Sequence, residues 1–164
     1  MPEPPPRPDA AAEPLPAAWV GHSGLLLDSF ARLVGRELLP RTGSPADQAA
    51  RLFAAPFVVV SHDTSPDPLL TYGNRTALAL WEMDVATLCR TPSRLTAEPM
   101  HRDERERLLA RTLRDGFVDD YAGVRISATG RRFRIGPAIV WNLVDDAGIL
   151  RGQAATFDRW TPLP

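Results

Sequence analysis

Apolar side chains recur at helical spacing near the N-terminus of the chain, in the stretch HSGLLLDSFARLVGRELLP. The repeat consists of Leu27, Phe30, Val34 and Leu38. Ser23 can cap the start of this segment and Pro40 cannot continue it, so the pattern predicts an amphipathic helix over 23–39. The apolar stripe of this helix must cover either its own sheet or a partner subunit.

A second strong helical pattern occupies HRDERERLLARTLRDG, which Gly116 closes as a C-terminal cap. We expect its charged side chains to face solvent and four others to face the core: Leu108, Leu109, Thr112 and Leu113. A shorter helix is predicted in GSPADQAARLFAAP, with Ser44 as its cap and Pro56 as its stop. Between these patterns, Pro92 and Pro99 allow only short helical pieces.

Five segments have the composition of strands. Phe57–Val60 and Leu69–Tyr72 flank the polar turn HDTSPDP, which predicts a hairpin. Three more segments follow the second helix, and the short connections ATG and DDAG join them: FVDDYAGVRIS, RRFRIGPAIVWNLVD and ILRGQAATFDRW. Strands that are segregated from helices in this way predict an α+β fold with a five-stranded antiparallel sheet.

The chain is divided by composition into a tail, a helical part and a core. Residues 1–17 carry seven prolines and no apolar periodicity, so we expect a disordered Pro-rich tail. Residues 18–55 form an N-terminal helical extension of two helices, and 56–160 form the core. Apolar residues make up 44% of the 164-residue chain, which is enough for one folded domain.

Charge and cysteine content exclude several kinds of partner and site. The formal net charge is −1, so no overall field attracts nucleic acid or an anionic membrane. Cys89 is the only cysteine, which rules out an internal disulfide and a Cys-based zinc site. His62, Asp63 and Asp67 fit no metal loop, and we expect no metal site. Without a secretory pattern or a long apolar run, the predicted location is the cytoplasm.

The ordered segments resemble a known family. Seven blocks resemble bacterial MEKHLA domains: APFVVVSH, YGNRTALALWEMD, PSRLTAEPM, ERERLLAR, DDYAGVRIS, GRRFRI and VWNL…RGQAATF. The resemblance runs from Leu25 to Trp160 and implies a PAS-like five-stranded antiparallel sheet with helices on one face, around a small cavity. It further implies a sensory or regulatory domain that binds a small molecule or a partner in or around the cavity. Such domains often dimerise through an N-terminal helix, so we expect a homodimer through the 23–39 helix.

The same resemblance raises the question of a flavin or a haem. In photosensory relatives a reactive cysteine and a glutamine serve the flavin, and these positions fall here on Pro92 and Thr156. Both side chains differ, which argues against covalent flavin photochemistry, and Cys89 is interpreted as a small buried apolar side chain. His101 begins the long helix, where capping or exposure is favoured over haem ligation. The sequence identifies no other cofactor.

Polar residues in apolar strands supply candidates for contact with a ligand. Asn142 and Gln153 could project into one cavity, or could form an internal hydrogen-bond pair that fixes strand register. In the stretch YGN, Gly73 permits a sharp turn and Asn74 can cap the next helix. The complete candidate set for the cavity is Tyr72, Asn74, Trp141, Asn142, Gln153 and Phe157.

Arginines of two neighbouring strands form a further candidate. Arg132 and Arg134 alternate with Phe133, and Arg125 lies on the preceding strand. Such guanidinium groups could bind a carboxylate or a phosphate, although a solvated sheet face balanced by aspartates explains them as well.

No catalytic arrangement is recognisable in the sequence: it has no Ser-His-Asp spacing, no phosphate loop and no two-His metal motif. We therefore predict no catalytic residues and favour a sensory module without an output domain of its own. The alternatives are an enzyme that uses the same cavity on a small molecule, and a pure protein-interaction or dimerisation module.

Overall fold

The computed structural model describes residues 15–164, so most of the tail predicted for 1–17 lies outside the described residues. The helices are α1 (Ala17–Val34), α2 (Pro45–Phe53), α3 (Arg75–Trp81), α4 (Val85–Leu88), the 3-10 turns η1 (Ser93–Thr96) and η2 (Pro99–His101), and α5 (Arg102–Asp115). The strands are β1 (Val58–His62), β2 (Leu70–Gly73), β3 (Phe117–Ile126), β4 (Arg132–Val144), β5 (Leu150–Phe157) and β6 (Trp160–Pro162).

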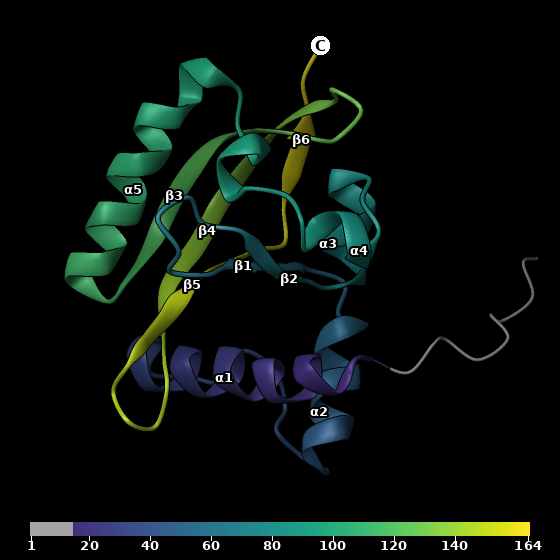
Figure 1. Ribbon diagram of the computed structural model, residues 1–164, viewed down its shortest axis with the longest axis vertical. Coiled ribbons are helices and arrows are strands. Elements are labelled where there is room, and N and C mark those ends of the chain that lie inside the picture. The colour runs from purple at the N-terminus through teal and green to yellow at the C-terminus, as the bar shows by residue number, and fades with distance from the viewer. Residues whose placement is uncertain (1–14) are drawn as a thin grey trace, which may run out of the picture.

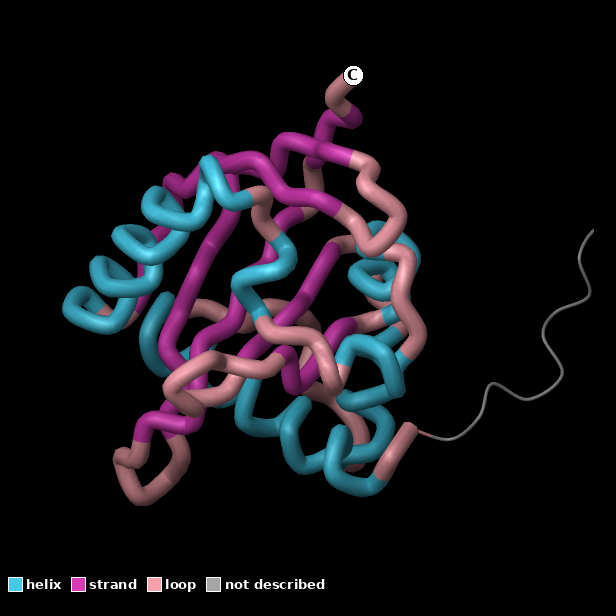
Figure 2. The backbone as a smooth tube through the Cα atoms, turned by 45° about the horizontal axis from the view of Figure 1, so that its top comes forward, coloured by secondary structure: helices cyan, strands magenta, loops and turns pink. Residues whose placement is uncertain are grey.

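The strands form one antiparallel sheet in the order β2-β1-β5-β4-β3, and β6 pairs with the first residues of β4. Figure 2 shows these strands in magenta, running between helices that lie on either side of them. The predicted α+β class, the antiparallel sheet and the first hairpin are confirmed. The predicted last strand is in fact two strands, because Asp158 and Arg159 interrupt the pairing.

Helix α1 begins and ends earlier than the sequence pattern predicts. It starts at Ala17, so Ser23 lies inside the helix, where its hydroxyl donates to the carbonyl of Trp19 at 2.7 Å. It ends at Val34 because Gly35 adopts φ 86° and its N–H bonds back to Ala31. Although α1 is long, no helix among residues 15–164 is both long and apolar enough to cross a bilayer.

The apolar stripe of α1 packs against its own sheet. Leu26, Leu27 and Phe30 are fully buried, and the Phe30 ring meets Trp141 of β4 edge-on with centroids 5.0 Å apart. Figure 1 shows α1, in purple, lying below the strands. Burying each of these side chains stabilises the fold by about 1.5–3 kcal/mol, so α1 is part of the core.

The opposite face of the sheet is covered by α3, α4, the 3-10 turns and α5, which lies to the upper left in Figure 1. Helices therefore cover both faces. Helix α5 packs through Leu108 and Thr112, whereas Leu113, which the pattern placed in the core, is 55% exposed. Arg105 is buried instead, because positions 105, 108 and 112 follow one stripe of the helix.

Candidate functional site

A cavity of about 60 Å³ lies between α5, η1 and the central strands. Strand alternation explains its inner wall, since every second residue of a strand points to the same face. His62 of β1 stands opposite Gln153 of β5, and Val60 stands opposite Ala155. The lining residues are Val60, Ser61, His62, Leu70, Trp81, Ser93, Thr96, Arg105, Leu108, Leu109, Tyr121, Arg125, Ile135, Val140, Gln153, Ala154, Ala155 and Phe157.

Arg105 reaches the cavity from α5 and is only 7% exposed. Its guanidinium donates a hydrogen bond to the hydroxyl of Ser93, which η1 supplies. Burial, reinforced by the charge of Arg125, lowers the pKa of Arg105 to about 10. The side chain therefore remains a cation at neutral pH, in a place where water is largely excluded.

Arg125 enters the same cavity from β3 and is also 7% exposed. It donates to the carbonyl of Val124 at 2.9 Å and to the hydroxyl of Tyr121 at 3.1 Å, and it lies over the Tyr121 ring. Within residues 15–164, neither Arg105 nor Arg125 has a carboxylate at salt-bridge distance. All of the contacts described for the two guanidinium groups are thus with neutral groups.

The register of β3 and β4 separates Arg125 from the other arginines of the candidate cluster. Arg125 pairs with Phe133, while Arg132 and Arg134 pair with Ile126 and Val124. Paired residues share a face, so Arg125 points to the cavity and the other two arginines point away from it. The guanidinium cluster that the sequence offered is therefore split by the fold, and Arg125 joins Arg105 instead.

His62 adds an unpaired nitrogen to the cavity wall. Its Nδ1 donates to the carbonyl of Asp63 at 2.9 Å, which leaves Nε2 as an acceptor. Nε2 is buried and has no hydrogen-bond partner within residues 15–164. Burial lowers the pKa of His62, and the nearby charge of Arg105 lowers it further, so the ring is neutral at pH 7.

Asn142 and Gln153 form a hydrogen-bonded pair, which was one of the two alternatives that the sequence left open. The Gln153 amide donates to Asn142 Oδ1 at 3.1 Å and to the carbonyl of Leu109 at 3.0 Å. Asn142 donates in turn to the carbonyl of Leu113 at 3.3 Å. The pair ties α5 to the sheet, and Gln153 lines the cavity as well.

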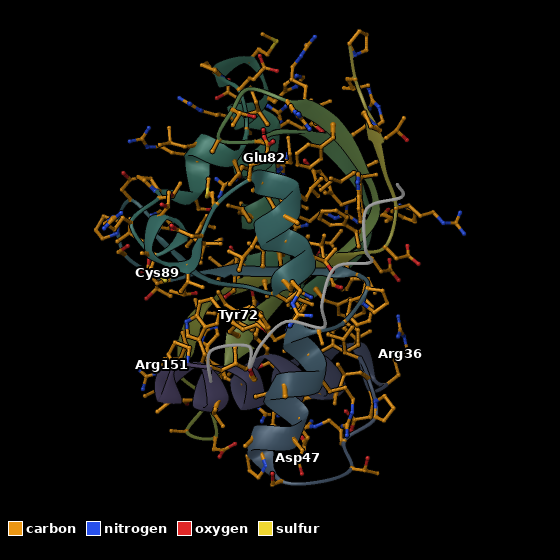
Figure 3. The ribbon with its side chains drawn as sticks, turned by 90° about the vertical axis from the view of Figure 1, so that its right-hand side faces the viewer. Arg36, Asp47, Tyr72, Glu82, Cys89 and Arg151 are labelled. Carbon is orange, nitrogen blue, oxygen red and sulfur yellow. The ribbon has the colours of Figure 1, made fainter. Side chains whose placement is uncertain are left out.

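The other four candidates divide between the two faces. Phe157 lines the cavity, where it packs edge-on against Trp81. Tyr72 and Trp141 lie on the α1 side, and the Tyr72 ring is 4.7 Å from that of Trp19. A register shift in the first hairpin, at Thr71, brings Tyr72 to the α1 face although Leu70 faces the cavity. Figure 3 labels Tyr72 close to α1.

Asn74 is fully buried and its side chain is occupied by the fold. Its Oδ1 accepts the backbone N–H groups of Val59 and Ala77, both at 3.1 Å. Its Nδ2 donates to the carbonyls of Leu52 and Phe57 at 3.2 and 2.7 Å. Asn74 therefore caps α3 as predicted and also joins α2 to β1, so none of these four bonds involves the cavity.

The cavity residues do not fit a flavin. Ligand pockets usually hold at least roughly 300 Å³, several times this volume. Thr156, the position compared with the photosensory glutamine, does not line the cavity, and its hydroxyl donates to the carbonyl of Val58 at 2.8 Å. The prediction that Cys89 is buried is wrong: Leu88 takes the inward position at the end of α4, and Cys89 is exposed (Figure 3).

The helical spacing in α5 indicates that Arg105 faces the core, but we expected the charged side chains of this helix to face solvent. Arg105 stands three residues before Leu108 and seven before Thr112, which places it on the buried stripe of α5. The sequence pattern suggested His62 only as a metal-ligand candidate, which was not favoured, and as part of a polar turn. Its alternation with Val60, which lies two residues earlier on a buried strand, is the signal that it faces inward.

Three solved structures show the same fold. An RNA-binding light-oxygen-voltage receptor matches with a TM-score of 0.57 at 18% identity, over 73% of this chain and 34% of that chain. The PAS domain of a protein from Colwellia psychrerythraea matches with a TM-score of 0.55 at 9% identity, over 71% of this chain and 94% of that chain. The light-state dimer of the fungal blue-light photoreceptor Vivid matches with a TM-score of 0.53 at 12% identity, over 79% of this chain and 91% of that chain.

These likenesses establish a PAS-like fold and nothing finer, since all three identities are low and the chain spans only about a third of the first structure. No curated protein matches the chain. The family model of the MEKHLA domain matches residues 20–162, which include every element from within α1 to β6. The chain therefore belongs to the MEKHLA domain family.

Proposed function

We propose that this chain is a PAS-like sensory or regulatory domain that binds a small molecule in the cavity beside α5. One observation carries the proposal: polar side chains from four elements converge on a cavity with otherwise mostly apolar walls. These are His62 of β1, Arg105 of α5, Arg125 of β3 and Gln153 of β5. A few converging polar groups in an apolar cavity are typical of ligand sites.

Burial of unpaired cations also favours a binding role over a filled core. Removing a charge from water costs several kcal/mol unless an opposite charge compensates it. No carboxylate of residues 15–164 lies at salt-bridge distance from Arg105 or Arg125, both of which are buried, so the domain carries this cost. Groups that lower stability in this way are expected where they serve function.

The position of the cavity provides a route for a signal. Arg105 lies where α5 contacts the sheet, and so does the hydrogen bond from Gln153 to the carbonyl of Leu109. A ligand that binds better to one position of α5 than to another shifts the population of the two. The output then passes to a partner of the domain, since binding changes the surface that α5 presents.

Self-association through the N-terminal helix stays a prediction. The apolar stripe of the helix cannot be the surface that forms the dimer. Leu27 is buried against the sheet, so a dimer would use the exposed side of α1, where Ala18 and Gly21 lie. Light scattering tests this: Gly21→Glu should dissociate a dimer without unfolding the domain, because Gly21 is exposed and a Cβ there meets no neighbouring atom within 4 Å. A monomeric wild type at high concentration would contradict it.

Cavity filling tests the proposed function. Ala155→Val adds two methyl groups to the cavity wall at a strand position that suits a β-branched residue. Thermal shifts with a panel of small polar compounds, together with native mass spectrometry, should show binding to the wild type and little binding to this variant. Ala122→Val, at an exposed position of β3, is the control and should bind like the wild type. If no compound distinguishes the wild type from Ala155→Val, the cavity is not a ligand site.

A further inference from the structure

Two guanidinium groups that have no carboxylate of residues 15–164 at salt-bridge distance face one small cavity. Arg105 comes from α5 and Arg125 from β3, and each residue is only 7% exposed. Their hydrogen bonds go to the hydroxyls of Ser93 and Tyr121 and to the carbonyl of Val124. Two positive charges in a low-dielectric site attract an anion more strongly than the same charges at the surface. The electrostatics therefore favour a negatively charged ligand.

The two arginines retain unused donors for such a ligand. A guanidinium carries five N–H groups in a planar fork, which matches the two oxygens of a carboxylate. The hydrogen bond of Arg105 to Ser93 uses only one of its nitrogens, Nη2. Arg125 uses Nη1 and Nη2 for its two neighbours, and Nε makes no hydrogen bond within residues 15–164. A planar oxyanion can thus be held without breaking these contacts.

Size and wall chemistry narrow the class of anion. The cavity of about 60 Å³ is several times smaller than the roughly 300 Å³ at which ordinary ligand pockets begin, so it suits a molecule of only a few non-hydrogen atoms. Val60, Leu108 and Val140 supply aliphatic surface beside the arginines. A short alkyl group gains from this surface, whereas a tetrahedral dianion such as phosphate gains nothing from it.

We propose, building on the function proposed above, that the bound molecule is a short-chain monocarboxylate, in the range from formate to propionate. Its carboxylate lies between the guanidinium groups of Arg105 and Arg125, and its alkyl part contacts the aliphatic wall. The ligand neutralises one of the two buried charges and thereby draws α5 and β3 together.

Calorimetric titration of the full chain with sodium formate, acetate and propionate, against sodium chloride at equal ionic strength, tests this class. We expect saturable binding of at least one carboxylate and no binding of acetamide, which has nearly the shape of acetate without its charge. Arg105→Gln and Arg125→Gln should each weaken binding at least tenfold. Arg107→Gln on the exposed side of α5 and Arg134→Gln on β4 are matched controls and should bind like the wild type.

The other outcomes separate this inference from the proposed function. Binding of acetamide or another neutral compound that Ala155→Val abolishes would overturn the carboxylate and leave the sensory cavity in place. Equal binding of nitrate and acetate would show a general anion site and overturn the monocarboxylate class. If no compound binds and Ala155→Val behaves like the wild type, both proposals fail. Should Arg105→Gln not fold, Arg105→Lys keeps the charge without the fork and should still bind more weakly than the wild type.

Discussion

The two faces of the sheet are built from the same alternating strands but treat buried polar groups differently. Under α1, two buried groups have no hydrogen-bond partner within residues 15–164, and both are neutral: the hydroxyl of Tyr72 and the indole N–H of Trp141. Under α5, His62 Nε2 and the indole N–H of Trp81 likewise have no hydrogen-bond partner within residues 15–164. This face in addition buries two cations, Arg105 and Arg125, which have no carboxylate of residues 15–164 at salt-bridge distance. An unpaired neutral group costs about 1–3 kcal/mol, and an unpaired charge costs more.

This difference separates a face that holds the fold together from the face on which we propose that a ligand binds. On the α1 side, aromatic rings fill the space, with Phe30 edge-on to Trp141 and Trp19 against Tyr72. On the α5 side, a cavity remains, and Arg105 is held there by a single hydrogen bond to Ser93 of η1. The tightly packed aromatic core thus lies on one face, and the proposed binding cavity lies on the other.

The largest expected effect lies on the α1 face. Phe30→Ala removes a fully buried ring from its contact with Trp141 and should lower the free energy of unfolding by about 3–5 kcal/mol. Urea unfolding followed by tryptophan fluorescence measures this loss. The variant that remains folded should bind ligand as the wild type does, and a large loss of affinity would show that the two faces are coupled.

A pH titration tests the same face by another route. Burial lowers the pKa of His22 to about 4, and its Nε2 shares a hydrogen bond with the hydroxyl of Ser61. The unfolded chain takes up this proton near pH 6.5 and the folded chain only near pH 4, so stability falls as the pH drops through this window. The loss should be roughly 3 kcal/mol, at about 1.4 kcal/mol for each pKa unit.

His62 contributes to the pH dependence with the same sign, because burial lowers its pKa too. The variant His22→Gln separates the two, since it removes the titrating group on the α1 face only. Chemical unfolding between pH 7 and pH 4 should show a clearly smaller loss for His22→Gln than for the wild type. Identical curves would mean that His22 is not buried in its neutral form.

On the cavity face, a substitution should raise stability. Arg105→Met keeps much of the aliphatic length and removes a buried charge, so the ligand-free domain should gain about 1–4 kcal/mol. The same variant should lose carboxylate binding. Arg107→Met at an exposed position of α5 should stay within about 0.5 kcal/mol of the wild type. Destabilisation by Arg105→Met would assign Arg105 to the structural framework and remove the contrast between the faces.

The smallest effect concerns the link between α5 and the sheet. A double-mutant cycle with Asn142→Ala and Gln153→Ala isolates the hydrogen bond between the two amides, which we expect to contribute about 0.5–1.5 kcal/mol. Urea unfolding of the four proteins gives this coupling energy. A coupling near zero would show that the backbone bonds to Leu109 and Leu113 anchor the helix without help from the pair.

The sequence was sufficient to predict where most helices and strands lie, but it was insufficient to predict the register in which the strands pair. Apolar periodicity located α5 and the strands, and turn chemistry located the cap at Asn74. Alternation shows which residues share a face of one strand, but the register of two strands depends on contacts distant in sequence. For this reason Arg125 could not be assigned to the side of Phe133, and the bulge that moves Tyr72 away from the cavity could not be foreseen.

The site itself was predictable only in part. Gln153 and Phe157 were found because a polar residue in an apolar strand and an aromatic ring beside it stand out in the pattern. Arg105 was placed outside the core because charged residues are rarely fully buried. That rule describes stable cores, and the buried Arg105 departs from it on the face for which we propose binding.

The most direct test is a crystal structure of the protein grown with sodium propionate. We predict planar electron density between the guanidinium groups of Arg105 and Arg125, with the ethyl group toward the aliphatic wall and the core under α1 unchanged. Ordered water in the cavity, with a carboxylate of the chain itself paired to the two arginines, would contradict the account, because the charges on this face would then be balanced within the fold.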